Sequence, residues 1–164
     1  MVESIPQRSF ENFCLKEGIT RHFTISRKAQ QNGVAERMNR TLLEKARCMR
    51  LFAGLSKLFW AEAVNTACYL VNKSPSTALG LKTLKKIWSG KPVDYSDLHI
   101  FGCPVYVLLQ DEQRTKLDAK SKQCIYLGYK VGVKGFKVWD PNTKKSELYR
   151  NVIFDEASML KKIQ

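Results

Sequence analysis

The chain has 164 residues, enough for one medium domain or two small ones. At 44% hydrophobic and 26% charged residues, its composition predicts a globular core and argues against wholesale disorder. No apolar run is long enough to cross a membrane, and the N-terminus lacks a secretory pattern. The five dispersed cysteines include no CxxC pair and are predicted to be reduced, so the protein is expected to be intracellular. The net charge of +13 favours a polyanionic partner, because lysine and arginine neutralise phosphates and release their counterions.

The first 95 residues are predicted to be mainly helical. A short helix is expected near residues 7–17, and a short strand over residues 19–25. An apolar ladder with i, i+4 spacing predicts an amphipathic helix over residues 32–52, which Gly54 ends. Ser56 caps a following helix that stops near Pro75, and a brief helix is expected over residues 84–88.

From His99 onwards the pattern changes to β-branched and aromatic runs separated by turn signals. The runs are HIFGCPVYVLL, CIYLGY, GFKVWD and NVIF, which predict four or five short strands and hence a small barrel or sandwich. A domain boundary is therefore expected near residue 95, between residues 1–95 and 96–158. The first part carries 16 Lys and Arg against 7 Asp and Glu, and the rest carries 12 against 8, so the first part is the more basic.

Several separate motifs resemble, in the same order, the C-terminal half of copia-type retrotransposon integrases. QQNGVAERMNRTLLEKAR resembles the helix that carries the third catalytic carboxylate, with FENFCLKEGI before it and FWAEAVNTACYLVNKSPS after it. FGCPVYV, KLDAKSKQCIYLGY, KGFKVWDP and NVIFDE resemble the small SH3-like domain that follows the core in the Pol polyprotein. The resemblance implies the end of a ribonuclease-H-like α/β core, mostly helical here, followed by an all-β barrel.

The resemblance also implies phosphoryl transfer with two Mg²⁺ ions, which two aspartates and one glutamate hold in this family. The glutamate corresponds to Glu36, whereas no aspartate precedes Asp94 in this chain. A single carboxylate cannot hold a catalytic metal pair, so the chain alone is expected to bind no cofactor and to catalyse no integration. Glu36 is then an ancestral magnesium ligand of an incomplete site.

The residues around Glu36 are predicted to face DNA. On a helix, Asn32, Glu36 and Arg40 fall on one stripe that Asn39 and Arg47 flank, and Arg27 and Lys28 lie in the preceding loop. The resemblance implies that this stripe contacts the DNA end near the metal site. The net charge of +13 predicts binding to the phosphate backbone that is largely independent of sequence. For Arg50, a DNA contact and an ordinary helix-surface role are equally supported.

The β-rich part has a basic rim and several aromatic residues that either stack on bases or form the core, and core is favoured for Phe136 and Trp139. The rim lysines are Lys120, Lys122, Lys130, Lys134, Lys137, Lys144 and Lys145. The barrel is expected to be more stable than the first part, whose apolar helix stripe invites self-association.

The leading interpretation is an inactive integrase remnant that binds DNA, located in the nucleus if expressed. Two alternatives stay open: a fragment of an active integrase within a longer polyprotein, and a domesticated module that binds a host protein.

Overall fold

The computed structural model describes residues 7–20, 33–109, 115–130 and 132–160. The chain divides into two compact units, residues 1–38 and 39–164. The predicted strand over residues 19–25 and the loop with Arg27, Lys28 and Asn32 fall largely or wholly outside the described residues. The predicted domain boundary near residue 95 stays a prediction.

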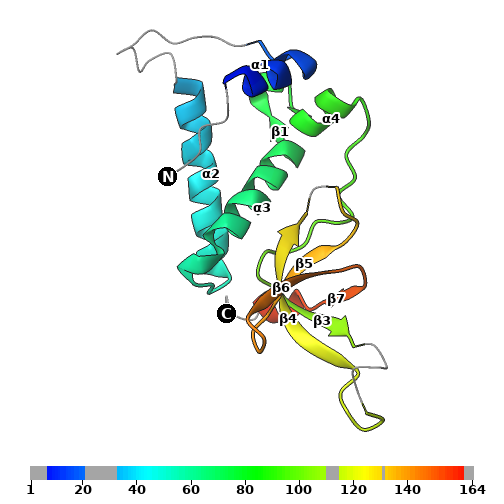
Figure 1. Ribbon diagram of the computed structural model, residues 1–164. Coiled ribbons are helices and arrows are strands. Elements are labelled where there is room, and N and C mark those ends of the chain that lie inside the picture. Colours follow the sequence, from blue (N-terminus) through cyan, green and yellow to red (C-terminus); the bar gives the residue numbers. More distant parts are fainter. Residues whose placement is uncertain (1–6, 21–32, 110–114, 131, 161–164) are drawn as a thin grey trace. The chain divides into compact units, whose positions relative to one another are not determined.

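The predicted helices are present almost at their predicted ends (Figure 1). Gly54, with a φ of 67°, follows the long helix as predicted. Ser56 caps the next turn, since its Oγ accepts from the Leu58 amide at 3.4 Å. The helices are α1 (Gln7–Lys16), α2 (Gly33–Phe52), η2 (Lys57–Phe59), α3 (Trp60–Lys73), η3 (Thr77–Leu79), α4 (Leu84–Ser89) and α5 (Ala157–Leu160). A two-stranded ribbon of β1 (Pro75–Ser76) and β2 (Lys82–Thr83) lies between α3 and α4.

The second half of the chain folds into a five-stranded antiparallel sheet with the order β6-β5-β4-β3-β7. Its strands are β3 (Pro104–Leu108), β4 (Ser121–Tyr129), β5 (Phe136–Asp140), β6 (Lys145–Tyr149) and β7 (Val152–Phe154). The sequence predicts four of them. It does not predict β6, because the sequence of that strand, KSELY, is polar and almost wholly exposed. The predicted Asp140-Pro141-Asn142 turn connects β5 to β6, where the Lys144 amide donates to the Asp140 carbonyl at 2.9 Å.

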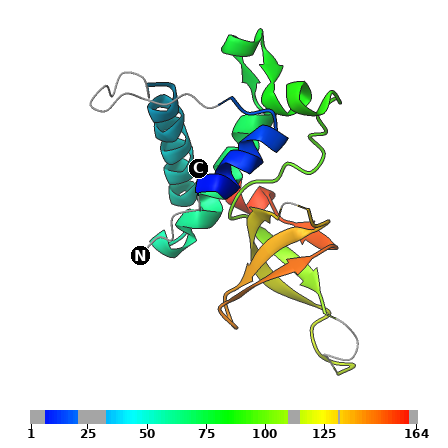
Figure 2. The same ribbon diagram turned by 45° about the horizontal axis from the view of Figure 1, so that its top comes forward.

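The sheet does not close into a barrel, which corrects that part of the sequence prediction. Within the described residues β6 and β7 each pair with a single strand and form the two edges, as the twisted sheet in Figure 2 shows. Only Arg150 and Asn151 separate the two edge strands in sequence. Three Cα–Cα steps span about 11 Å at most, so the edges approach each other at this corner. The sheet is therefore curled, with one open seam.

The helices of residues 39–73 and the sheet share one hydrophobic core. Gly102 lies against the turn after α2: a Cβ built on it falls 2.3 Å from the Ala53 Cβ. Gly128 lies against α3, since its built Cβ falls 2.5 Å from the Thr66 Oγ1. The buried core residues are Ala46, Ala53, Leu55, Ala63 and Ala67 from the helical segment and Phe101, Cys103, Val105, Val107, Cys124, Tyr126, Leu127, Val138 and Met159 from the β-rich segment. Leu42, Met49, Phe136 and Trp139 pack at its margin, as predicted for the last two.

Two sets of polar contacts fasten the segment between α4 and β3. The Lys73 ammonium, which is 2% exposed, donates to the Asp94 carbonyl at 2.6 Å and lies 3.6 Å from the Asp97 carboxylate. His99, which stands alone in the sequence pattern, also has a structural role. Its Nδ1 lies 3.0 Å from the Glu156 Oε1, and its ring stacks on Phe154 at 3.5 Å. These contacts hold the segment on α3 and on the end of the sheet.

Candidate nucleic-acid interface

Glu36 lies in the first turn of α2, and its side chain is exposed. Among the described residues, no three His, Cys, Asp or Glu side chains lie close enough together to hold a metal ion. The sequence of the chain supplies no aspartate before Asp94. The described residues therefore form no metal-binding cluster at Glu36, and the incomplete magnesium site stays a prediction.

The predicted DNA-facing residues that the structure describes lie on one helix. Asn39, Arg40 and Arg47 are all exposed on α2. Arg40 and Arg47 are seven residues apart, which is two turns and roughly 10 Å along the same face. Neither guanidinium forms an ion pair with any described residue. Two exposed cations on one helix face can contact two phosphates of a nucleic-acid backbone.

Arg50, at the C-terminal end of α2, is half-buried and forms a hydrogen bond within the fold. Its Nη1 donates to the Leu55 carbonyl at 2.7 Å, beyond the C-terminus of α2. This contact gives a hydrogen-bond partner to a carbonyl in the turn that follows the helix. This hydrogen bond favours a structural role for Arg50, and a DNA contact by the same residue stays a prediction.

Two lysines of the predicted basic rim are also engaged inside the protein. Lys122 pairs with Asp140 at 2.9 Å; this hydrogen bond raises the pKa of the ammonium and lowers that of the carboxyl. Lys137 pairs with Glu62 of α3 at 2.8 Å. Burial alone would raise the pKa of Glu62, but the hydrogen bond from Lys137 leaves it lowered. These two lysines are poor candidates for phosphate contacts.

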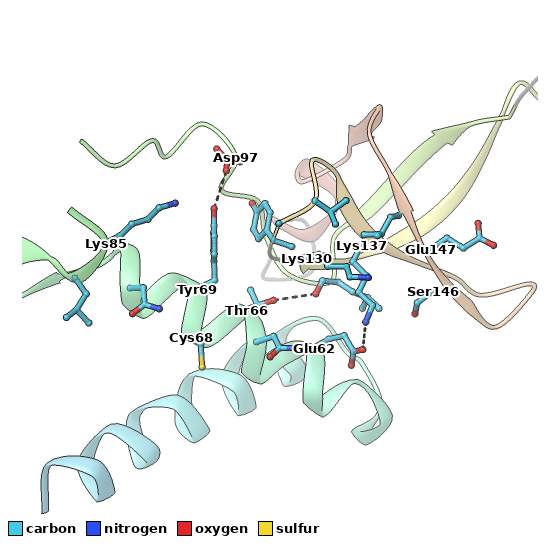
Figure 3. Close-up of a pocket in the computed structure, with 18 of the residues that line it drawn as sticks. Glu62, Thr66, Cys68, Tyr69, Lys85, Asp97, Lys130, Lys137, Ser146 and Glu147 are labelled. Carbon is cyan, nitrogen blue, oxygen red and sulfur yellow. Dashed lines mark hydrogen bonds and ion pairs between the residues drawn. The ribbon is translucent and has the colours of Figure 1, made fainter. Parts of the chain in front are cut away.

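A groove of about 1170 Å³ lies beside α3, between α4 and the sheet (Figure 3). One wall is the polar face of α3 with Asn65, Tyr69 and Asn72, and α4 contributes Lys85 and Trp88. The other side is formed by the β4–β5 connection and by β5 and β6.

No membrane-crossing helix is found in the part of the chain that the structure describes.

The tyrosines near this groove are held in place by stacking. Tyr69 stacks on Tyr129 with ring centroids 4.4 Å apart, and its hydroxyl donates to the Asp97 carboxylate at 3.1 Å. Burial and the neighbouring Asp97 raise the pKa of Tyr69 to about 12. The sequence does not predict the groove, because α3, α4 and the sheet meet only in the fold. The one sequence signal for the groove is the polar stripe of α3, which lies on the face of that helix opposite its alanine stripe.

Comparison with known proteins first defines the class of the β-rich part. Residues 103–164 match the family described as the retroviral polymerase SH3-like domain. This match covers the five-stranded sheet and the residues after it.

The full chain then matches longer polyproteins. It is 47% identical over 152 residues, 93% of its length, to the retrovirus-related Pol polyprotein from transposon TNT 1-94 of Nicotiana tabacum. It is 30% identical over 145 residues, 88% of its length, to the Pol polyprotein from transposon RE2 of Arabidopsis thaliana. It is also 43% identical over 83 residues to an uncharacterized mitochondrial protein of Arabidopsis thaliana, covering 68% of that protein and 51% of this chain. The chain is therefore homologous over most of its length to copia-type retrotransposon Pol polyproteins, as its motifs indicated.

The chain spans about a tenth of the length of the Pol polyproteins it matches, 11% for TNT 1-94 and 10% for RE2. No solved structure matches it.

Proposed function

We propose that the chain is a DNA-binding remnant of a copia-type integrase, and that its helices derive from the end of a ribonuclease-H-like core. The observation that carries the proposal is the exposed Arg40–Arg47 pair on α2, which forms no ion pair with the described residues, in a chain of net charge +13. Homology to the Pol polyproteins over 93% of the chain supports the ancestry. The ligand is the phosphate backbone, bound without sequence preference. Self-association stays a prediction.

Arg40→Gln combined with Arg47→Gln is expected to weaken duplex DNA binding and to flatten its salt dependence. Removing one phosphate contact lowers the slope of log K against log salt by about 0.9, so the double variant should lower it by about 1.8. Fluorescence anisotropy with two unrelated duplex sequences at several salt concentrations measures the slope. The matched control is Lys57→Gln combined with Arg150→Gln, which removes the same charge from exposed positions elsewhere. Equal slopes for the two double variants would show that α2 is ordinary solvated surface.

The 164-residue chain alone is expected to join and cleave no DNA with Mg²⁺ or Mn²⁺. The reason is that Glu36 is one carboxylate where the family's chemistry uses three. A strand-transfer assay with a labelled oligonucleotide, run on the natural chain and on Glu36→Gln, measures this. Metal-dependent products that vanish in Glu36→Gln would contradict the proposal and favour the working-integrase alternative.

A further inference from the structure

The groove beside α3 is lined by three lysines and three carboxylates, and two of the lysines form no ion pair among the described residues. Two of these carboxylates are occupied internally: Glu62 by Lys137 at 2.8 Å, and Asp97 by Tyr69 and Lys73. Lys85 and Lys130 also line the groove, and neither pairs with a carboxylate of the described chain. The third carboxylate, Glu147, lies on β6 and accepts from the Tyr149 hydroxyl. Of the two lysines without an ion pair, Lys85 lies at the end of the groove next to α4.

The same end of the groove presents a flat aromatic ring to solvent. Trp88 lines it with 74% of its surface exposed, a large exposure for this side chain. Lys85 precedes it by three residues, so the two side chains project from the same side of α4. Figure 3 shows Lys85 reaching toward Tyr69, whose ring is already stacked on Tyr129. Trp88 is thus the aromatic ring with a free face at this end of the groove.

Two asparagine side chains also line the groove. Asn65 and Asn72 line the groove from α3, seven residues apart on one face of the helix. Neither amide forms a hydrogen bond within the described residues. Each amide supplies two donors and an acceptor, the groups that base edges and phosphates require.

We propose that this groove binds a short single-stranded stretch of nucleic acid. Trp88 stacks on an unpaired base, Lys85 and Lys130 contact its flanking phosphates, and the two asparagines bind base edges or backbone oxygens. Duplex DNA is excluded as the ligand because its base faces are covered by their neighbours in the stack. An acidic peptide would engage the lysines, but its carboxylates offer no flat ring system to stack on Trp88.

This inference extends the proposed function, and different residues carry the two. Arg40 and Arg47 serve the duplex on α2, whereas Trp88 and Lys85 serve the single strand on α4. If only the groove assignment fails, the duplex slope still responds to the arginine variants. If only the duplex proposal fails, single-strand binding still responds to Trp88.

The test uses the 164-residue chain and a labelled dT20 oligonucleotide, with an rU20 strand and a duplex of equal length beside it. Trp88→Ala is expected to raise the Kd for dT20 roughly tenfold, and Trp88→Phe should restore most of the affinity because a ring remains. The neighbouring Ile87→Ala, an exposed α4 residue outside the groove, should leave the Kd unchanged. Duplex binding should not change in any of the three.

A second pair of variants tests the phosphates. Lys85→Gln should reduce the salt slope for dT20 by about 0.7, the value for one contact to a single strand, while Lys86→Gln on the same helix should not. Circular dichroism of each variant confirms that it is folded. A dT20 affinity that is unaffected by both Trp88→Ala and Lys85→Gln would overturn the proposal. A poly-glutamate peptide that competes with dT20 provides a second test. The proposal would be overturned if both variants bind this peptide more weakly but bind dT20 with unchanged affinity.

Discussion

Gly102→Ala is expected to lower the free energy of unfolding by about 2–5 kcal/mol. Gly102 has a φ of 77°, where an L side chain is strained by roughly 1–2 kcal/mol. The new Cβ would also lie 2.3 Å from the Ala53 Cβ and 3.3 Å from the Leu55 Cδ1. Overpacking of this kind costs about 1–3 kcal/mol more. Urea denaturation followed by circular dichroism measures the decrease.

Gly132→Ala provides a matched control for this effect. Gly132 has a φ of 78°, yet a Cβ built on it meets no atom within 4 Å. It should therefore show the backbone strain alone, and the difference between the two variants reports the packing of the α2–α3 turn on the sheet. Equal decreases would mean that this turn does not pack on the sheet in solution.

The contact at Gly102 changes the expected relative stability of the helices and the β-rich part. The sequence favours the β-rich part as the stable part, because all its predicted strands lie within the chain. In the structure, alanines of α2 and α3 share a core with the strands, and Thr66 Oγ1 donates to the Leu127 carbonyl at 3.4 Å. Residues 39–73 and the sheet should therefore unfold together. Hydrogen exchange should then protect α3 and β4 similarly.

Most elements are predictable because each carries a local signal. The apolar ladder predicts α2, the cap at Ser56 and Pro75 bracket α3, and aromatic runs mark four strands. β6 has no apolar alternation, because it is an edge strand whose side chains face water. The open seam between β6 and β7 is not predictable, because closure depends on hydrogen bonds between strands and not on the composition of either.

The candidate sites also include residues that the sequence predicts and residues that it does not. Asn39, Arg40 and Arg47 are predicted from a helical pattern and a family resemblance, and their exposure on α2 is consistent with that interpretation. Arg50 is undecided from sequence because its partner is a carbonyl oxygen five residues later, which no residue type reveals. The groove requires three elements to meet, so Trp88 and Lys85 have no sequence signal beyond their residue types.

The protein is expected to lose stability steeply at alkaline pH. Tyr126 is fully buried, its hydroxyl has no hydrogen-bond partner among the described residues, and burial raises its pKa well above the usual value near 10. Burial also raises the pKa of Tyr129 and of the Cys103 thiol to about 12. Each of these groups stays protonated in the folded state at a pH where the unfolded chain has released the proton.

The sign of the effect follows from proton linkage. Below its unfolded pKa, each group is protonated in both states, and its contribution to stability is fully present. As pH rises above about 9 for the thiol and 10 for the tyrosines, the unfolded state binds fewer protons, so the free energy of unfolding falls. The decrease continues until pH passes the folded pKa. Tyr126 alone should contribute about 1.4 kcal/mol for each pH unit inside this window.

Urea denaturation at pH values of about 8, 9, 10 and 10.8 measures the slope in the natural chain and in Tyr126→Phe. The variant keeps the ring, whose edge-to-face contacts with Tyr129 and Phe154 have centroids 5.7 and 5.3 Å apart, and removes a buried hydroxyl that lacks a partner among the described residues. It should be as stable as the natural chain at about pH 8 and more stable at about pH 10.8, because one titrating group is gone. Tyr106→Phe, which changes an exposed side chain of β3, is the control. If Tyr126→Phe leaves the alkaline slope of the free energy of unfolding unchanged, the Tyr126 hydroxyl is in contact with water. That result would contradict the dry core that joins α3 to the sheet.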